Sequence, residues 1–245
     1  MDITPEEQNI CDAAVIYVKE HKKDFIAEYV QSKPEVTEGK PLAIFMAGSP
    51  GAGKTEFAET FLANPQVNGL DIVYIDPDAL RKKMPGYGGG NSHLFQKGVS
   101  RLVNELYSAT LQQKRSFLLD GTMSSYVQAE QNIQRAIKHD YEVYIFYVYQ
   151  DPISAWRFTQ AREKTEGRRI HKSTFITQFL SASKSVNELK VHFKKEVTIH
   201  LIVKDVFHKI KKYETNIDRI DSYIKHTYTK NTLEDTLIVQ HDFPH

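Results

Sequence analysis

The chain has 245 residues, a length in the range of a single α/β domain built around one core. Its 32 Lys and Arg residues are balanced by 31 Asp and Glu residues, so no overall basic field favours a nucleic acid or a membrane surface as partner. The single cysteine, Cys11, excludes an internal disulfide, and no CxxC or Cys/His grouping surrounds it.

The amino-terminal residues predict neither export nor a membrane anchor. The segment MDITPEEQ carries acidic residues where a signal peptide needs positive charge followed by an apolar run. The longest apolar stretches, residues 42–47 and 143–149, are much shorter than the roughly 20 residues of a membrane-spanning helix. We therefore expect a soluble, cytoplasmic protein without a membrane partner.

Residues 6–30 predict one or two amphipathic helices, because apolar and charged residues recur there at helical spacing. A polar stretch that contains Pro34 and Gly39 then predicts a linker into the first strand. This helical extension, residues 1–38, could be a docking site for an inhibitor or a cover for the sheet, and we favour the cover.

The core, residues 40–205, alternates short apolar runs with helical segments. The runs are residues 42–47, 71–75, 117–119, 142–149 and 198–203. Because they are almost continuously apolar, they predict strands covered on both faces, and the alternation predicts a mainly parallel five-stranded sheet flanked by helices. An apolar stripe from Phe175 to Phe193 predicts a helix packed on this core. Residues 206–245 are expected to form a helical tail on the same single α/β domain.

A phosphate-binding loop follows the first predicted strand. Residues 48–55 read GSPGAGKT and precede a helical pattern, so the GxxxxGK[ST] motif stands in its required strand, loop and helix context. Successive backbone N–H groups and the positive end of the helix dipole can then face phosphates. A glycine-rich turn that only joins strand to helix is the weaker alternative.

The motif predicts the P-loop nucleoside-triphosphate hydrolase fold. Lys54 is expected to bridge the β and γ phosphates of ATP and to serve catalysis, and Thr55 to ligate Mg²⁺. The residues predicted to bind the nucleotide are Gly48, Ser49, Pro50, Gly51, Ala52, Gly53, Lys54 and Thr55.

Acidic residues follow the second and third predicted strands, at the edge where open α/β sheets bind ligands. Asp78 can accept the proton of an attacking hydroxyl, while Asp76 can cap the next helix or orient a substrate. Asp120 ends the third strand as a Walker B acid does and is expected to hold Mg²⁺, with Thr122 nearby as a substrate contact.

Basic residues after the fourth predicted strand indicate a lid. A helix begins at residues 151–152, and Arg162, Arg168 and Arg169 lie toward its end. Arginines there can neutralise charge on transferring phosphoryl oxygens, which makes Arg162 and Arg168 catalytic candidates and Arg169 a weaker one. The alternative is ordinary surface charge, since Arg162 and Glu166 are spaced to pair on a solvated helix.

The acceptor side is predicted between the second and third strands. The glycine-rich stretch from Pro85 to Asn91 is either a substrate-binding loop or a plain connector. On the helical segment that follows, Asn104 or Glu105 could hydrogen-bond an acceptor.

Together these motifs resemble the zeta toxins, which are P-loop kinases of toxin–antitoxin systems related in fold to chloramphenicol phosphotransferase. The similar stretches are GSPGAGKT, the strand end IDPD, the PGY element, LLDGT and AWRFTQAREKTEGRR, which fall within residues 40–175. The resemblance implies the ATP-binding, magnesium-binding, base and catalytic roles given above for Lys54, Thr55, Asp78, Asp120, Arg162 and Arg168.

In characterised zeta toxins the acceptor is the 3′-hydroxyl of the sugar in UDP-N-acetylglucosamine. This chain differs there, because Asn104, followed by Glu105, stands where the family has a substrate-holding glutamate, and Asp120 replaces a glutamate. The resemblance implies an ATP- and Mg²⁺-dependent kinase that phosphorylates a hydroxyl of a small metabolite, first of all a UDP-activated amino sugar, with an antitoxin as a candidate partner.

Two alternatives stay open. The acceptor could be another nucleotide, an antibiotic or a nucleic acid end, although the balanced charge argues against nucleic acid. The protein could also be an ATP-regulated binding protein without kinase activity. Asp78 and the lid arginines favour the kinase, because a switch protein needs no base aimed at a hydroxyl.

Overall fold

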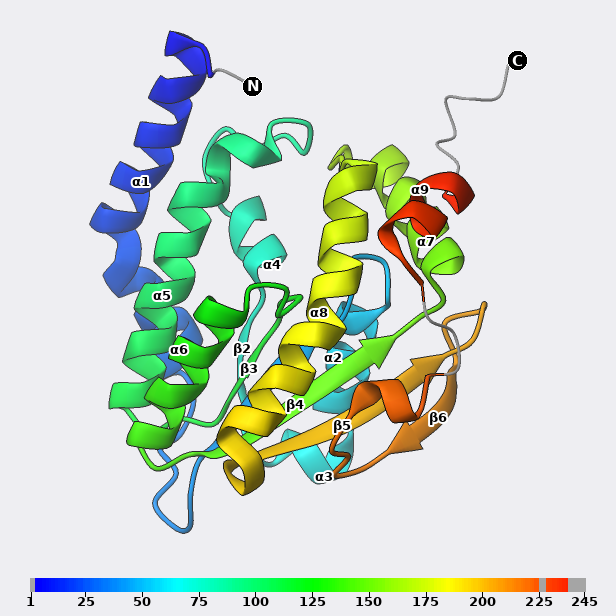
Figure 1. Ribbon diagram of the computed structural model, residues 1–245. Helices are drawn as coiled ribbons and strands as arrows, with labels where there is room; N and C mark the ends of the chain where they lie inside the picture. Colours follow the sequence, from blue (N-terminus) through cyan, green and yellow to red (C-terminus); the bar gives the residue numbers. More distant parts are fainter. Residues whose placement is uncertain (1–2, 225–227, 238–245) are drawn as a thin grey trace.

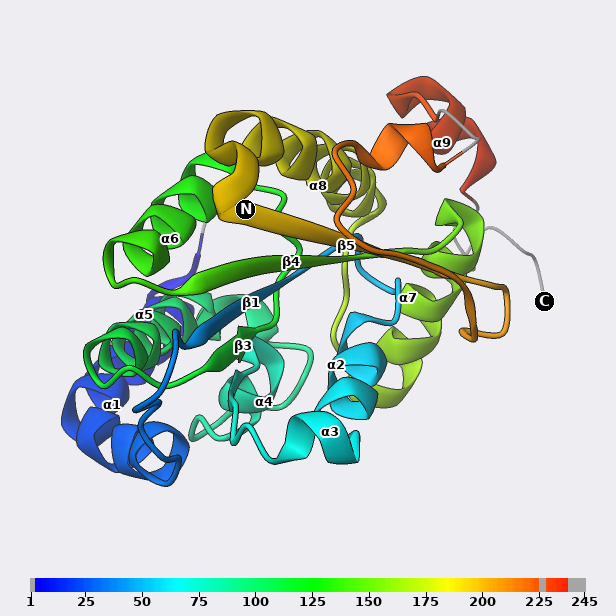
Figure 2. The ribbon, with the colours of Figure 1, turned by 90° about the horizontal axis from the view of Figure 1, so that it is seen from below.

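The computed structural model describes residues 3–224 and 228–237. Within these residues the sheet has six strands in the order β2-β3-β1-β4-β5-β6 (Figures 1 and 2). The strands are β1 (Leu42–Ala47), β2 (Val73–Ile75), β3 (Phe117–Leu119), β4 (Glu142–Tyr149), β5 (Val197–Lys204) and β6 (Ile210–Glu214). All neighbours pair in parallel except β5 and β6, which are antiparallel. The predicted, mainly parallel α/β sheet is confirmed, with one strand more than expected.

Helices cover both faces of the sheet (Figure 2). On one face, α2 (Lys54–Ala63) and α3 (Pro65–Asn68) pack on alternate residues of the central strands, such as Ile44 and Met46 of β1. The opposite face carries the other alternate residues, such as Phe45, beneath α5 (Gln96–Gln112), α6 (Tyr126–Lys138) and α8 (Lys172–Phe193). Strands buried on both faces must be apolar throughout, which explains the continuous apolar runs of the sequence.

The predicted amino-terminal helix is α1 (Pro5–Ile26), followed by a π-helical turn, Ala27–Gln31. Thr4 and Glu7 form a capping box at its start. Helix α1 packs on the outer side of α5 (Figure 2), where Gly98 leaves room for the backbone of Ala14. The expected cover therefore lies mainly over α5, which itself lies on the sheet.

The predicted helical tail is wrong in its first part, because Ile210–Glu214 forms the antiparallel edge strand β6. The Asp205 carboxylate accepts hydrogen bonds from the backbone N–H groups of Phe207 and Lys209, and this turn reverses the chain after β5. A short helix, α9 (Lys230–Thr236), follows and packs Leu233 against α8 and α7. Residues 225–227 and 238–245 of the expected tail lie outside the described residues.

Two helices begin directly at the carboxyl ends of strands. Helix α4 (Pro77–Lys82) follows β2, and α7 (Pro152–Glu166) follows β4. The remaining elements are short 3-10 helices at Ser92–Phe95, Lys194–Glu196 and Ile220–Ser222. Among the described helices, none combines the length and the apolar composition that crossing a lipid bilayer requires.

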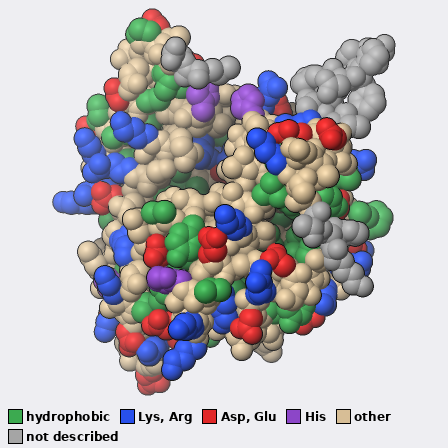
Figure 3. Space-filling view, viewed as in Figure 1, with side chains coloured by type: hydrophobic (Ala, Val, Ile, Leu, Met, Phe, Trp, Pro, Cys, Tyr) green, Lys and Arg blue, Asp and Glu red, His purple; other side chains and the backbone are tan. Residues whose placement is uncertain are grey.

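Charges of both signs are interspersed over the face drawn in Figure 3, as the balanced composition leads one to expect. No single-sign field covers this face.

Candidate active site

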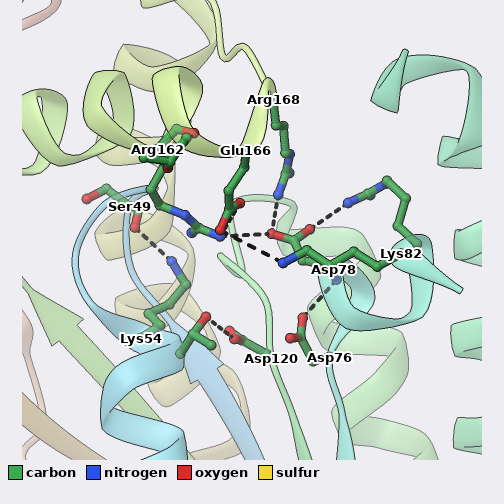
Figure 4. A network of polar contacts seen from close by, with 12 residues as sticks. Ser49, Lys54, Asp76, Asp78, Lys82, Asp120, Arg162, Glu166 and Arg168 are labelled. Atoms are coloured by element: carbon green, nitrogen blue, oxygen red, sulfur yellow. Dashed lines mark hydrogen bonds and ion pairs between the residues drawn. The ribbon is translucent and has the colours of Figure 1, made fainter. Parts of the chain in front are cut away.

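A cavity of about 490 Å³ opens at the carboxyl ends of the parallel strands, between α4 and α7. The loop after β1 forms its floor, the end of β3 contributes Asp120, and α7 contributes Arg162. Ligands of open α/β sheets bind at this edge. The sequence motifs that are far apart in the chain therefore meet in one place (Figure 4).

The loop of residues 48–53 joins β1 to α2 and curves around the side chain of Lys54. Gly51 has a φ of +69°, and a Cβ there would collide with the carbonyl oxygen of Ala155 in α7, so only glycine fits. The Lys54 ammonium donates hydrogen bonds to the backbone oxygens of Gly48 (3.1 Å) and Ser49 (2.7 Å).

Burial lowers the pKa of Lys54, although the negative charges of Asp120 and Asp78 oppose this shift. Among the described residues, its ammonium has only these two carbonyl oxygens as hydrogen-bond partners, and its low-dielectric surroundings favour an incoming anion. The loop, the start of α2 and this buried cation fit a nucleotide phosphate chain.

Thr55 and Asp120 lie side by side at the base of the cavity. The Thr55 hydroxyl donates a hydrogen bond to Asp120 Oδ2 (2.9 Å), and the hydroxyl of Tyr74 donates to the same oxygen (3.3 Å). Burial raises the pKa of Asp120, which is 7% exposed, while the charge of Lys54 acts in the opposite direction. A hydroxyl and a carboxylate in contact are the oxygen ligands that Mg²⁺ prefers.

No group of three or more His, Cys, Asp or Glu side chains could hold a metal ion by itself within the described residues. Mg²⁺ in nucleotide sites is commonly bound through one or two protein oxygens together with phosphates and water, and the pair formed by Thr55 and Asp120 fits that arrangement.

Asp76 and Asp78 have different surroundings although they are two residues apart. Asp76 caps α4, since its Oδ1 accepts a hydrogen bond from the backbone N–H of Asp78 (2.8 Å). Burial and the nearby charge of Asp120 raise the pKa of Asp76 to about 6. The capping expected for Asp76 is therefore present.

The carboxylate of Asp78 faces three arginines, of which Figure 4 labels Arg162 and Arg168. Arg81 Nη1 lies 2.5 Å from Oδ1, Arg168 Nη1 contacts Oδ2, and Arg162 Nη2 is 3.8 Å from Oδ2. Burial alone would raise the pKa of Asp78, but these guanidinium groups outweigh it and hold the pKa below its usual value. Asp78 is thus an ionised carboxylate at neutral pH.

Arg81, which is 3% exposed, belongs to the site but was not predicted from the sequence. Its Nη2 donates to Gln96 Oε1 (3.0 Å), and its buried Nε has no hydrogen-bond partner among the described residues. Arg81 therefore joins Asp78 to the start of α5. The only signal in the sequence is its position three residues after Asp78 on a short helix, where the two side chains can pair.

The lid arginines belong to the last turn of α7 and the residues after it. Arg162 pairs with Glu166 (3.1 Å) and also lies near Asp78. It therefore forms the ion pair that the alternative interpretation predicted and at the same time lines the cavity. Arg168 follows the helix and also lines the cavity, whereas Arg169 pairs with Glu163 (3.7 Å) outside it.

The glycine-rich stretch of residues 85–91 packs on this lid. Gly89 has a φ of +77°, and a Cβ there would collide with the carbonyl oxygen of Glu166 at the end of α7. The stretch is therefore a contact between α4 and the lid, and neither of the cavities described in this section is lined by it.

Asn104 and Glu105 are not at the site, which corrects the expectation for both. Asn104 Oδ1 accepts a hydrogen bond from Arg135 of α6 (3.1 Å), and Glu105 lies 3.5 Å from Lys22 of α1 and from Arg101. The physical reason is the rotation of α5, which turns other residues toward the strand ends.

A second cavity, of about 280 Å³, lies between α5 and α6. Other residues of α5 and the end of β3 line it. Thr122 lines both cavities, as do Pro77, Gln96, Asp120 and Gly121, so the two spaces adjoin at the site acids. The substrate contact of Thr122 stays a prediction, and the helix that carries Asn104 contributes Gln96, Ser100 and Val103 to the second cavity.

The sequence model of the zeta toxin family matches residues 26–218. A comparison with curated protein sequences gave no match.

Among solved structures, a chain of the PezAT chromosomal toxin–antitoxin system of Streptococcus pneumoniae is 18% identical, with a TM-score of 0.60 over 97% of this chain and 89% of that one. The AvrRxo1-ORF1:AvrRxo1-ORF2 complex with sulphate ions is 15% identical, with a TM-score of 0.60 over 89% of this chain and 70% of that one. The complex with ATP is 15% identical, with a TM-score of 0.58 over 85% and 64%. At these identities the likeness shows a common fold.

Proposed function

Because the chain belongs to the zeta toxin family, we propose that it is an ATP- and Mg²⁺-dependent kinase that transfers the γ-phosphoryl group to a hydroxyl of a small metabolite. The observation that supports this most is the position of Asp78. Its ionised carboxylate lies in the same cavity as the phosphate-binding loop and is surrounded by Arg162 and Arg168.

In this proposal the loop residues 48–55 bind the phosphates of ATP, and Lys54 supports the β and γ phosphates. Thr55 and Asp120 hold Mg²⁺, which would neutralise phosphate charge when bound. Arg162 and Arg168 stabilise the charge that grows on the transferring group, and Asp78 orients the attacking hydroxyl and accepts its proton. In the structure, Arg162 and Arg168 both lie against the carboxylate of Asp78. In the proposed mechanism they leave this carboxylate and move toward the phosphates when the substrates bind.

The acceptor that we put first is a nucleotide sugar of the UDP-activated amino sugar class, on the strength of the family resemblance. We also propose that the protein acts in the cytoplasm and that an antitoxin binds it. The support for the partner is that similar solved structures come from a toxin–antitoxin system and from a two-protein complex.

The test is incubation with γ-labelled ATP, Mg²⁺ and a fractionated bacterial metabolite pool, followed by mass spectrometry of the labelled product. UDP-N-acetylglucosamine is the first pure compound to try. A folded Lys54→Ala variant, compared with wild type by circular dichroism, is the control, and it should give no labelled product. ATP turnover that is the same with and without every pool fraction would refute the kinase and favour a switch protein.

A further inference from the structure

Lys204, the last residue of β5, is a buried cation that has no role in the mechanism described above. Its exposed fraction is 6%, and lysine side chains are rarely buried so completely without an acidic partner. Among the described residues, its ammonium has no ion pair and one hydrogen-bond acceptor, the backbone oxygen of Gly53 (2.9 Å). Burial lowers the pKa of Lys204, and the charge of Glu56 opposes this shift only in part. Two of the three N–H donors of this buried ammonium are thus left without an acceptor among the described residues.

The surrounding backbone directs Lys204 toward the phosphate loop. The pairing of β5 with β6 changes register between Val203 and Lys204, an irregularity of the kind that re-aims side chains beside active sites. The next residue, Asp205, is held by the buried Gln150 directly after β4, whose Nε2 donates a hydrogen bond to the backbone oxygen of Asp205 (2.6 Å). The place from which the Lys204 side chain starts is therefore fixed by two strands of the sheet.

The contact with Gly53 lies at the positive end of α2. Gly53 precedes this helix with a φ of +80°, and its oxygen also accepts a hydrogen bond from the backbone N–H of Phe57 (3.2 Å). A cation beside a helix N-terminus is repelled by the helix dipole, and Lys54 places a second buried cation in the same loop. Two cations and a helix N-terminus at one place favour the binding of an anion.

The carbonyl of Gly53 determines the direction of the amide that follows it. Because a trans peptide is planar, the C=O of Gly53 and the N–H of Lys54 point in opposite directions. Gly53 and Lys54 line the nucleotide cavity and Lys204 does not, so the bond from Lys204 holds this oxygen on the side away from the cavity. The N–H of Lys54, which has no acceptor within its own helix, is then directed at the cavity.

We propose that Lys204 is a positioning residue of the nucleotide site. Through the oxygen of Gly53 it holds the N–H of Lys54 toward the phosphates of a nucleoside di- or triphosphate, and its charge strengthens the attraction of the loop for them. The negative charge of the bound phosphates in turn offsets the cost of burying this lysine. The inference rests on the proposed kinase function and adds to it a residue of β5 that touches neither substrate.

The stability of the protein and its affinity for nucleotides should therefore respond differently to Lys204→Met, which keeps the length of the side chain and removes its charge and donors. Without nucleotide the variant should be at least as stable as wild type, because an apolar side chain replaces a buried cation at a helix N-terminus. Its Kd for Mg-ATP and for Mg-ADP should rise about tenfold or more, because the loop loses a charge-assisted hydrogen bond and a positive charge. A lysine with a merely structural role would give lower stability and an unchanged Kd.

Calorimetric titration with Mg-ATP and Mg-ADP, together with thermal unfolding in the absence of nucleotide, measures the two effects. Lys211→Met is the matched control, because Lys211 is an exposed lysine of β6 and its replacement removes the same charge from the same hairpin. The control should change neither quantity. A Lys204→Met variant that is less stable than wild type, or that binds Mg-ATP with the Kd of wild type, would overturn the inference and leave the kinase standing. A wild-type protein that binds neither nucleotide would refute the proposed function and the inference with it.

Discussion

The carboxylate of Asp78 is where the nucleotide cavity, the lid and α4 meet, and removing its charge is the most direct test of the proposed chemistry. Asp78→Asn keeps the shape of the side chain and removes its basicity. General base catalysis contributes about 10² to 10⁴ in rate, so transfer to the acceptor should slow by at least a hundredfold. ATP affinity, measured by calorimetry, should stay within a few fold of wild type.

Asp76→Asn is the matched control because an asparagine can still cap α4. It should lower the rate of transfer much less than Asp78→Asn. If Asp76→Asn is inactive and Asp78→Asn is close to wild type, the two roles are reversed. If both variants keep their activity, no carboxylate after β2 assists proton removal.

The raised pKa of Asp76, about 6 against an ordinary 3.8, predicts a pH dependence of stability. Between these values the folded protein holds a proton that the unfolded chain has released, so this group lowers stability as the pH rises from about 4 through 6. Above pH 7 the buried carboxylate is charged, and Asp76→Asn should raise Tm by a few degrees. The gain should shrink toward zero near pH 4. A difference in Tm that is independent of pH, measured by thermal unfolding from pH 4 to 8, would contradict this shift.

The lid arginines are expected to act on the transition state and not on ATP affinity. Arg162→Ala and Arg168→Ala should each lower kcat by about a hundredfold or more, with ATP affinity within a few fold of wild type. Arg169→Ala serves as the control, because Arg169 pairs with Glu163 outside the cavity. Steady-state kinetics and ATP titration separate the cases. Variants of Arg162 and Arg168 that only lose thermal stability would identify them as surface ion-pair residues.

The sequence could identify the residues of the phosphate loop and the strand-end acids because a local motif and a strand end fix their places. Thr55 and Asp120 are hydrogen-bonded to each other, and Thr122 adjoins both cavities. The roles assigned to these residues stay predictions. Arg81 could not be identified because its pairing with Asp78 depends on how α4 is buried. Asn104 was misplaced because neither its position on a helical segment nor the family resemblance fixes the rotation of α5.

At the scale of elements, β1 to β5 were predictable within one or two residues, because strands buried on both faces leave a continuous apolar signature. Strand β6 was not predictable, because most of its side chains face solvent and leave no apolar pattern. Its residues read IKKYE, and four of the five are exposed. Its pairing depends on the turn at residues 205–209, which returns the chain to β5, and not on an apolar pattern.

The contact between the glycine-rich stretch and the lid can be tested by comparing alanine variants of two glycines in this stretch. Gly86 and Gly89 both have a positive φ, but only Gly89 lies against the carbonyl of Glu166, while Gly86 has open space around it. Both alanine variants should lose about 1 kcal/mol of stability from the backbone conformation. Gly89→Ala should in addition shift α7 and lower kcat/KM by about tenfold or more.

Kinetics and denaturant unfolding of the two variants measure these effects. Equal kcat/KM values for Gly86→Ala and Gly89→Ala would mean that the contact is a plain connector with no influence on the lid.

At the scale of the whole molecule, the strand order decides which motifs meet. The chain visits the strands as β1, β2, β3 and β4, but in space the order is β2, β3, β1 and β4. The phosphate loop after β1 therefore lies between Asp120 after β3 and the lid after β4, and Asp76 and Asp78 after β2 lie farther out. The cavity between α5 and α6 adjoins the end of β3 and shares Asp120 with the cavity that contains the phosphate loop.

This arrangement ties the stability of the molecule to nucleotide binding, because the loop contacts α7, β4 and β5 as well as its own helix. Binding of Mg-ATP at a hundred times its Kd should add about 2.7 kcal/mol to the free energy of unfolding. For a chain of 245 residues this corresponds to a rise in Tm of about 5 to 11 °C. Lys54→Ala removes the principal side-chain charge expected at the β and γ phosphates, so most of the rise should vanish, and phosphoryl transfer with it.

Asp78→Asn is the matched control, since it should lose transfer but keep the full rise in Tm with Mg-ATP. Scanning calorimetry of wild type and both variants, each with and without Mg-ATP, measures the effect. A full rise in Lys54→Ala would mean that the nucleotide binds elsewhere, and no rise in the wild type would remove ATP from the function of this protein. A rise that is lost equally in both variants would mean that Asp78 holds the nucleotide and is not a base for the acceptor.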